Sequence, residues 1–522
     1  MKMNMKNLIV GCCLATIISF GIWLWEIYHT FVIPSPWWEV LPKLISQGLD
    51  HPQLKVFTFK SMAFGYGAMA FFLYLLWGDE SSRKNRRVVS GARVVDTYEI
   101  SSITRENKIR YWIAGLKQLC KMGTRKREQI EIASVPMPKK VEAVHTLFAG
   151  STGTGKTTGQ DEMISGALER GDRIIVVDNN AHSLERFARK GDVLLNPFDK
   201  RSPGWSPFNE LIGNSDYKMI ATALIPDANN STDQSWHDYA RTMLAECMRA
   251  LTASSDMSTE RLVWMATKAS SEELSKLLAG SAVAGLFQPG AEKPLASARF
   301  ILTHCLEPYQ HLRQSNFSLR KWIKAGRGNL FITWKEDQIG DLKPLVTAWL
   351  EIMIKAILTG EESNNPTDLF IDELGSLECM SGLEAGLTKG RKYGLRIVAC
   401  LQSISQLEAI YGTLRATTLR QCFRNIVVLG GSNSDPATAE ELSKGLGQSQ
   451  VEYTNVNYSR NSNGTTVSKS VQHASEYAVT STEIMSLDPY EGFLKFSGNY
   501  PIARIKFVRR EYATPITAFM ER

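Results

Sequence analysis

Residues 150–157 carry the pattern with the clearest chemical meaning. They read Gly-Ser-Thr-Gly-Thr-Gly-Lys-Thr and follow an apolar run at 144–149. The glycines let successive backbone N–H groups converge on a phosphate, and the helix expected next adds unpaired donors and a positive dipole end. Lys156 can reach the β- and γ-phosphates, and the Thr157 hydroxyl can ligate Mg²⁺. The predicted nucleotide-binding residues are Gly150, Ser151, Thr152, Gly153, Thr154, Gly155, Lys156, Thr157 and Thr158.

An acidic pair, Asp372 and Glu373, ends a second apolar run that starts at 368. A nucleotide-hydrolysing site needs such a pair across the sheet from its phosphate loop. Asp372 can hold Mg²⁺ through water, and Glu373 can orient or deprotonate the attacking water. Asp178 ends another apolar run but ranks second, because a single aspartate after a strand often only caps a turn. The expected ligands are therefore ATP and Mg²⁺.

Two further side chains are catalytic candidates by position. Gln402 directly follows the apolar run 395–401, where it can sense the γ-phosphate. Arg391 lies in the basic segment 388–394, from which it can reach the γ-phosphate of a neighbouring subunit and stabilise transition-state charge. The alternative for Arg391 is a solvated surface arginine, which is the commoner fate of this residue type. Spacing alone does not decide between these two interpretations.

The elements around these residues indicate an α/β fold. Strands alternate with helices at 158–170 and 340–358, which implies a parallel sheet with right-handed crossovers. The segment 451–470 is rich in Thr, Val, Tyr and Ser and predicts an exposed hairpin. Strands of the sheet are expected at 144–149, 173–178, 192–195, 329–334, 368–373, 395–401, 421–430, 492–497 and 502–508.

Residues 209–314 differ from the rest in composition. They are rich in Ala, Leu, Met, Ser and Glu and have almost no β-branched runs. No expected strand separates the helices of this segment, so it is predicted to be an all-α domain inserted into the nucleotide-binding domain, whose two parts are 86–208 and 315–522. Amphipathic helices are expected at 237–253, 259–268, 271–278 and 293–313.

The N-terminal residues 1–85 carry membrane signals. Helices at about 8–25 and 56–77 are mostly uncharged, and the first spans about 27 Å, close to the hydrocarbon thickness. Basic residues flank both outer ends, which predicts that both termini lie inside and that 26–55 lies outside. A cleaved signal peptide is the alternative. Few apolar residues precede Cys12, and export would separate the nucleotide site from ATP.

Composition sets wider bounds. The 522 residues leave room for two to four domains, and the formal charge of +7 suits an anionic partner or anionic lipid without identifying either. The eight cysteines form no CxxC pair and no metal-binding spacing. They indicate reduced thiols in a cytosol-like compartment.

Taken together, the chain resembles the type IV secretion coupling proteins of bacterial conjugation, the TrwB/TraD-like family. One shared feature is the order of two membrane helices, a RecA-like nucleotide domain and an all-α insertion. A second is Leu-Asn-Pro-Phe-Asp at 195–199 with Ser-Pro-Gly-Trp-Ser-Pro at 202–207, similar to the family's linker into the all-α domain. The third is Ile-Asp-Glu-Leu at 371–374, followed by Thr-Lys-Gly-Arg-Lys at 388–392 and Leu-Gln-Ser at 401–403.

This resemblance covers essentially the whole chain and implies a ring-forming ATPase, a homohexamer with a RecA-like P-loop domain. It implies a multi-pass protein of the bacterial inner membrane, under a secretion channel, with the bulk of the chain cytoplasmic. It also implies binding of DNA with little sequence preference, and ATP-driven transfer of single-stranded DNA and its attached relaxase into the type IV channel. Within the site, it implies that Arg391 is an arginine finger acting in trans and that Gln402 is the motif glutamine.

Two other functional classes compete with this interpretation. A transporter of the ABC type needs its signature before the acidic pair, whereas the nearest match, 442–448, follows it. A nucleotide-gated membrane scaffold would recruit protein substrates to a secretion channel without pumping DNA. Lys156, Asp372 and Glu373 favour turnover, but they do not show whether the cargo is DNA or protein.

Overall fold

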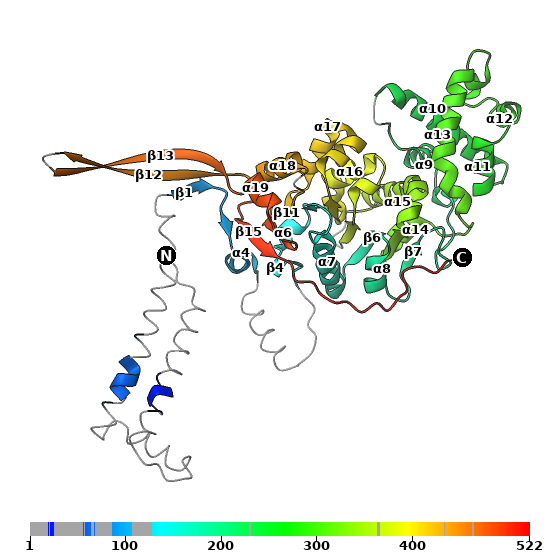
Figure 1. Ribbon diagram of the computed structural model, residues 1–522. Coiled ribbons are helices and arrows are strands. Elements are labelled where there is room, and N and C mark those ends of the chain that lie inside the picture. The colour runs from blue at the N-terminus through cyan, green and yellow to red at the C-terminus, as the bar shows by residue number, and fades with distance from the viewer. Residues whose placement is uncertain are drawn as a thin grey trace, which may run out of the picture. The chain divides into compact units, whose positions relative to one another are not determined.

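The computed structural model describes residues 86–106, 128–228, 231–362, 366–432, 434–461 and 464–521, with short pieces between residues 19 and 67. The chain forms two compact units. One comprises Met1–Val89 with Gln450–Ala474, and the other comprises Ser90–Ser449 with Ser475–Arg522. All the residues proposed above for chemistry belong to the second unit (Figure 1).

The first unit contains the predicted hairpin and the N-terminal pieces. Strands β12 (Gln448–Asn461) and β13 (Gly464–Tyr477) confirm the hairpin, and β1 (Arg86–Gly91) pairs beside β12 as a third strand. The described residues between 19 and 67 are helical, and Trp23 Nε1 donates to Thr58 Oγ1 over 3.1 Å. Within the described ranges, no helix combines the length and apolarity needed to span a membrane. The helices predicted at 8–25 and 56–77 lie largely outside those ranges.

The second unit is built on a mixed sheet, which confirms the predicted α/β class (Figure 1). Its described strands run in the order β2-β15-β14-β11-β5-β10-β9-β6-β8-β7. The seven strands from β11 to β7 are parallel, whereas β14 is antiparallel to β11 and β15 is antiparallel to β14. The bounds are β2 Val94–Val95, β5 Thr146–Ala149, β6 Arg173–Asn179, β7 Val193–Leu195, β8 Leu330–Trp334, β9 Thr367–Ile371, β10 Leu395–Leu401, β11 Asn425–Leu429, β14 Glu491–Lys495 and β15 Ile502–Lys506.

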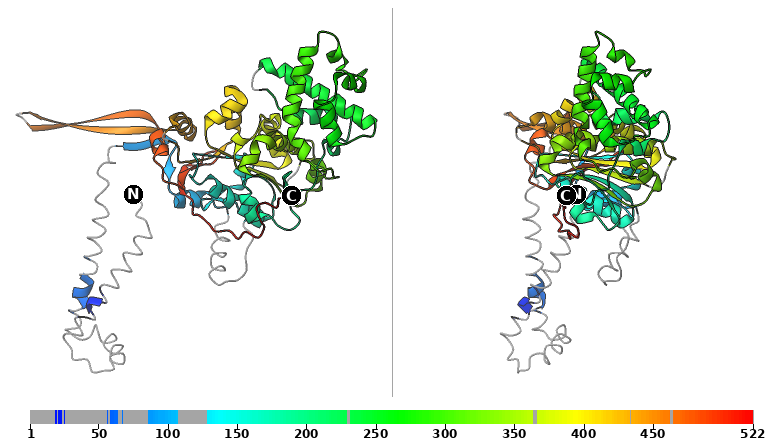
Figure 2. Two further views of the ribbon diagram at one scale, coloured as in Figure 1. Left: turned by 45° about the vertical axis from the view of Figure 1, so that its right-hand side comes forward. Right: turned by 90° about the vertical axis from the view of Figure 1, so that its right-hand side faces the viewer.

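Both faces of this sheet are covered, which explains why its strands read as continuous apolar runs. Along β6, Ile174 and Val176 join one core, whereas Ile175 and Val177 join the core on the opposite face. The first core is closed by helices α7 (Lys156–Arg170) and α8 (His182–Phe187). The second is closed by α15 (Ile339–Leu358) and α16 (Ser381–Lys389), and Figure 2 shows these two layers on either side of the sheet.

The helices predicted within 209–314 are present, and the domain boundaries around them stay a prediction. The helix expected at 293–313 ends at Leu306 and continues as a 3₁₀ turn, Glu307–His311, which contains Pro308. The helix expected at 237–253 begins earlier, at Ser231. The bounds are α9 Asp216–Leu224, α10 Ser231–Ala253, α11 Thr259–Thr267, α12 Ser271–Leu277, α13 Glu292–Leu306 and α14 Leu319–Ala325.

Glu210 joins the two ends of this helical segment. The carboxylate is fully buried, accepts the Trp205 indole N–H over 2.7 Å and accepts the backbone N–H of Leu319, at the start of α14, over 2.7 Å. A buried carboxylate needs such donors to offset its lost hydration. Trp205 belongs to the linker motif and therefore has a structural role. Through Glu210 it connects the chain before the helical segment to the start of α14, which follows that segment.

Smaller elements complete the unit. The strand predicted at 421–430 begins only at Asn425, because α17 extends through Cys422. After β15, residues 507–521 run along the surface to the linker, where Asp199 accepts the Met520 N–H over 2.9 Å (Figure 1). The remaining elements are α4 Thr97–Thr104, β3 Glu131–Ile132, β4 Val135–Pro136, α6 Lys139–Glu142, α17 Ile404–Cys422, α18 Pro436–Leu446 and α19 Ser481–Met485.

Candidate active site

Three neighbouring strands carry the site. The glycine-rich loop follows β5, the acidic pair follows β9, and Gln402 follows β10, which lies between the other two. The three strands are parallel, so their carboxyl ends meet at one edge of the sheet. Residues far apart along the chain are thereby brought to one pocket.

The loop 150–155 has the shape of a phosphate cradle. Gly153 and Gly155 adopt positive φ angles of 78° and 106°, a region that favours glycine. Gly155 directly precedes α7, whose first N–H groups have no partner within the helix. The loop is anchored on both sides, because Gly150 N–H donates to Leu401 O and Ser151 N–H donates to Gly430 O. These features give an anion site with a fixed backbone.

Lys156 is the first residue of α7, and its side chain folds back onto this loop. Its ammonium donates to the carbonyl oxygens of Gly150 over 2.8 Å and Ser151 over 3.0 Å. Burial lowers the pKa of Lys156, and the nearby carboxylates of Glu373 and Asp372 act in the opposite direction. The lysine and the acidic pair are therefore close enough to interact electrostatically, as the sequence motifs require.

Thr157 and Asp372 form the part of the site that suits a magnesium ion. The Thr157 hydroxyl donates to Asp372 Oδ1 over 3.2 Å, which places the two predicted oxygen ligands side by side. Burial raises the pKa of Asp372. Mg²⁺ favours oxygen ligands and is usually held by one or two protein groups, phosphate oxygens and water. The donor set fits this ion, whereas no cluster of three or more His, Cys, Asp or Glu suited to a metal occurs in the described residues.

Gln160, which the sequence analysis did not identify, positions Asp372. In the amide orientation that satisfies both neighbours, its nitrogen donates to Asp372 Oδ1 over 3.1 Å and its oxygen accepts the Ile371 N–H over 3.3 Å. Gln160 follows Lys156 by one helical turn on α7, so both side chains extend from the same helix face. That spacing was the available signal for Gln160.

Gln402 connects the phosphate loop to Glu373. Its Oε1 accepts the Thr152 hydroxyl over 3.0 Å, and its side chain also hydrogen-bonds Glu373. Glu373 in turn accepts the Gly375 N–H over 3.2 Å. Burial raises the pKa of Glu373 above that of a free glutamate. A general base is most effective when its pKa lies near the working pH, so this shift favours the role of a base. The arrangement can orient a water molecule and report on loop occupancy.

Tyr490 closes another side of the pocket. Its φ angle is +69°, a left-handed conformation that costs a non-glycine residue about 1–3 kcal/mol. Two backbone hydrogen bonds hold it, from Tyr490 N–H to Thr154 O over 2.9 Å and from Phe507 N–H to Tyr490 O over 2.8 Å. The pocket has a volume of about 330 Å³ and is lined by Thr152, Gly153, Gly155, Lys156, Thr157, Thr158, Asn179, Glu336, Asp372, Glu373, Ser376, Gln402 and Tyr490.

Two candidates from the sequence lie elsewhere. Arg391 is on an exposed 3₁₀ turn, Gly390–Tyr393, and is not among the described residues that line the pocket of its own chain. Asp178 is fully buried, and its Oδ2 accepts the N–H groups of Ser183 over 2.6 Å and Leu184 over 3.1 Å. It caps the start of α8, which is the structural role that a single aspartate after a strand often has.

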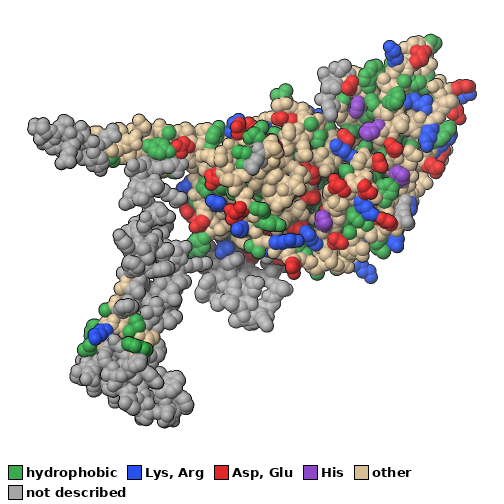
Figure 3. All heavy atoms as spheres, in the orientation of Figure 1, with side chains coloured by type: hydrophobic (Ala, Val, Ile, Leu, Met, Phe, Trp, Pro, Cys, Tyr) green, Lys and Arg blue, Asp and Glu red, His purple; other side chains and the backbone are tan. Residues whose placement is uncertain are grey.

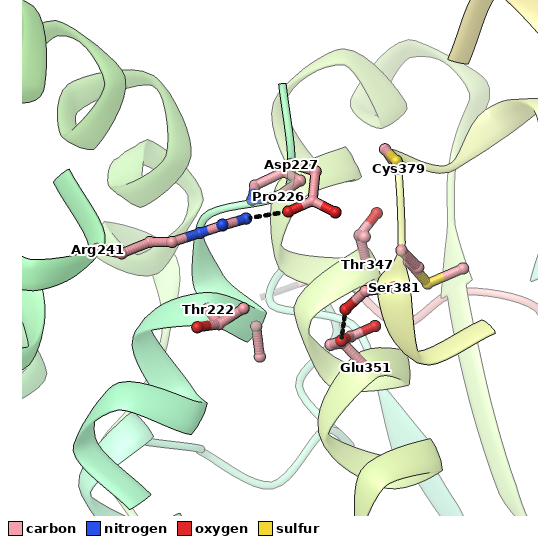
Figure 4. A pocket seen from close by; sticks show the side chains of 10 residues that line it. Thr222, Pro226, Asp227, Arg241, Thr347, Glu351, Cys379 and Ser381 are labelled. Atoms are coloured by element: carbon pink, nitrogen blue, oxygen red, sulfur yellow. Dashed lines mark hydrogen bonds and ion pairs between the residues drawn. The ribbon is translucent and has the colours of Figure 1, made fainter. Parts of the chain in front are cut away.

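A second, smaller pocket lies between α9, α10 and α15 (Figure 4). Its polar groups pair with one another. Arg241 donates to Asp227 over 2.8 Å, and Ser381 donates to Glu351 over 2.8 Å. Glu351 is further satisfied by the Gly382 N–H, over 2.7 Å. These paired groups lie where the helical segment packs against α15 and the start of α16 on one face of the sheet, so we assign the pocket a structural role.

The chain is similar to proteins of a known family over most of its length. The model of the family described as type IV secretion-system coupling protein DNA-binding domain matches residues 129–508. The coupling protein TraD of Escherichia coli (strain K12) is 30% identical over 306 residues, which are 56% of this chain and 42% of that protein. The conjugal transfer protein TraG of Rhizobium radiobacter is 27% identical over 182 residues, 34% of this chain and 28% of that protein. The chain thus spans less than half the length of these relatives.

Solved structures give a closer match. The bacterial conjugative coupling protein TrwBdeltaN70 has a TM-score of 0.76 and 37% identity, and the match covers 84% of this chain and 97% of that one. The plasmid coupling protein TrwB in complex with ADP and Mg²⁺ has a TM-score of 0.74 and 36% identity, with 84% of this chain and 98% of that one covered. TrwB structures also contain non-hydrolysable analogues of GTP and ATP.

Proposed function

Because the chain belongs to the type IV secretion-system coupling protein family, we propose that it is a ring-forming ATPase of conjugation. In this proposal, hydrolysis of Mg-ATP drives single-stranded DNA and its attached relaxase into a type IV secretion channel. The assembly is a homohexamer with a RecA-like nucleotide domain in each subunit. Helices at 8–25 and 56–77 anchor it in the bacterial inner membrane, and the bulk of the chain is cytoplasmic.

The observation that carries this proposal is the meeting of the loop and the acidic pair. Thr157 bonds to Asp372, and Gln402 bonds to both Thr152 and Glu373. In the proposed reaction, backbone N–H groups of 150–155 and Lys156 bind the β- and γ-phosphates. Thr157 and Asp372 hold the magnesium ion, which neutralises charge on the phosphate oxygens when it is bound.

The proposed catalytic step belongs to Glu373. Its carboxylate orients the attacking water and accepts a proton from it as the bond to the γ-phosphorus forms and the bond to the bridging oxygen breaks. Gln402 couples the position of Glu373 to the occupied loop. Arg391 of a neighbouring subunit stabilises charge on the transferred phosphoryl group, which requires a ring because Arg391 does not reach its own pocket.

The test is ATP hydrolysis by the purified full-length chain with and without single-stranded DNA. We expect DNA to stimulate hydrolysis at low salt and the stimulation to fade as salt rises, because phosphate contacts release counterions. We also expect specific activity to rise with protein concentration as subunits assemble. Nucleotide binding without any DNA stimulation at low salt would instead support the scaffold that recruits proteins.

A further inference from the structure

The proposed hydrolysis leaves one wall of the pocket without a role. The Tyr490 ring lies against Gly155, the last glycine of the loop. A Cβ atom added to Gly155 would be 2.8 Å from Tyr490 Cδ1 and 3.5 Å from Cε1. Among the described residues that line the pocket, Tyr490 has the only aromatic side chain.

The position of this ring is set by the backbone. Tyr490 is held in a left-handed conformation, and both of its backbone hydrogen-bonding groups are occupied, by Thr154 and Phe507. A bulky residue seldom persists in this conformation unless its surroundings fix it, and such residues gather at ligand sites. A glycine would adopt the same positive φ angle without strain, so the presence of an aromatic ring at this position requires an explanation.

The pocket is also larger than its phosphate-binding part. Its volume of about 330 Å³ reaches the range of sites that hold whole small molecules. Asp372, Glu373 and Gln402 gather around the catalytic end of the loop, where the terminal phosphate is proposed to react. Tyr490 instead lies against Gly155, directly before α7, beside the part of the loop that cradles the inner phosphates.

From this arrangement we propose that Tyr490 forms a base subsite, in which its ring stacks on the base of the bound nucleotide. The inference deepens the proposed function and rests on it, because it requires a nucleotide in this pocket. Stacking uses the flat face that all bases share, so it tolerates base identity. The subsite therefore accepts adenine and guanine with similar affinity.

Titration calorimetry of the full-length chain tests this subsite with three Mg²⁺-bound probes: ATP, GTP and inorganic tripolyphosphate. Tyr490→Gly removes the ring and keeps a residue that tolerates the positive φ angle. We expect it to weaken ATP and GTP binding by about tenfold and to leave tripolyphosphate binding unchanged. Tyr490→Phe restores the ring and should restore affinity for both nucleotides. Tyr98→Ala, at a tyrosine that is 78% exposed and outside the pocket, is the matched control.

Other outcomes would overturn the subsite. Unchanged affinity of Tyr490→Gly for ATP, or an equal loss for tripolyphosphate, would reduce Tyr490 to a support for the loop. A second measurement is independent of folding losses: the indole emission of Tyr490→Trp should change when Mg-ADP is added, and constant emission at saturation would contradict stacking. Failure of the proposed function looks different, because the unsubstituted chain would then not bind Mg-ATP, or Lys156→Ala would bind it equally well.

Discussion

Gln160 shows how one residue of the loop helix controls the magnesium site. In the amide orientation that satisfies both neighbours, its side chain bonds Asp372 Oδ1 and the Ile371 backbone N–H, which fixes the carboxylate relative to the strand that carries it. Partners of metal ligands commonly contribute about 10–100-fold to metal affinity or activity. Gln160 is in this sense a positioning residue that acts on the magnesium site through Asp372.

We predict that Gln160→Leu raises the Mg²⁺ concentration for half-maximal ATP hydrolysis by about tenfold. The reason is that Asp372 keeps only the Thr157 hydroxyl as a side-chain partner. Magnesium titration of the hydrolysis rate measures the effect, with Ser165→Ala on the exposed side of the same helix as control. An unshifted magnesium midpoint, with only stability reduced, would show that Gln160 is a packing residue.

At the scale of residues, the sequence predicted those whose role can be recognised from their neighbours along the chain. Lys156 and Thr157 belong to one continuous motif, and Glu373 follows an apolar strand, so their roles could be inferred without coordinates. Tyr490 could not be found in this way. It comes from a distant turn, and contacts that no sequence pattern encodes bring it to the loop: its backbone N–H bonds Thr154, and its ring lies against Gly155.

The close approach of α7 to the sheet depends on one position without a side chain. A Cβ atom at Gly159 would lie 2.5 Å from Phe148 Cε1 and 2.8 Å from Phe507 Cζ, both of them buried rings. In contrast, a Cβ atom at Gly166 on the same helix would meet Ile130 at 3.7 Å, an ordinary contact.

We therefore predict opposite effects of two identical substitutions. Gly159→Ala should lower the free energy of unfolding by about 1–3 kcal/mol, because the core is overpacked. Gly166→Ala should raise it by about 0.5–1 kcal/mol through helix propensity. Urea denaturation of both variants is the measurement. Equal effects of the two substitutions would contradict the packing of α7 on β5.

His145 joins three elements at the start of β5. Its Nδ1 accepts the Ile397 N–H over 3.0 Å, and its Nε2 lies 3.0 Å from the Leu387 carbonyl oxygen. Burial lowers the pKa of His145 from 6.5 to about 4. The unfolded chain binds this proton first, so the stability contributed by neutral His145 is fully present above pH 6.5 and is lost as pH falls through about 4.

We predict that His145 lowers the free energy of unfolding by about 2 kcal/mol as the pH falls from 7 to 5. Buried carboxyls whose pKa values are raised, such as Asp161 at about 6, act with the opposite sign, so the comparison is made against His145→Gln. Urea denaturation at both pH values should give a smaller fall for the variant, by that amount. Parallel pH dependences in the two proteins would show that His145 is not a buried neutral group.

At the level of elements, the sequence predicted whether a segment is a helix or a strand better than it predicted the residues at which that segment begins and ends. Alternating apolar runs and helical periods placed the parallel strands, because both sheet faces are buried. The strand at 425–429 was predicted too long, since α17 extends through Cys422, inside the expected range. The antiparallel edge formed by β14 and β15 was not expected either, because pairing direction depends on connections that periodicity does not encode.

On one face of the second unit, basic and acidic side chains are mixed (Figure 3). On the face seen in Figure 3, Lys and Arg side chains alternate with Asp and Glu over the helices and the sheet layers. On this face, the described residues present no basic patch that would suit DNA. DNA binding by a ring would instead depend on surfaces that several subunits create together.

The ring proposal makes a prediction about mixtures. Arg391→Ala subunits retain a complete pocket but lack the proposed finger, whereas Lys156→Ala subunits retain the finger but lack nucleotide binding. Mixing the two inactive variants should restore part of the DNA-stimulated hydrolysis, because some interfaces then pair an intact pocket with an intact Arg391. Complete inactivity of the mixture at concentrations where subunits assemble would count against a role in trans.

The claim on which the account rests is that Lys156, Asp372 and Glu373 act on one Mg-ATP. Single-turnover hydrolysis, measured beside equilibrium nucleotide binding in Glu373→Gln, tests it most directly. We predict near-normal Mg-ATP affinity and hydrolysis slower by about 10²–10⁴-fold, the usual contribution of a general base. Hydrolysis at the unsubstituted rate in this variant would contradict the account.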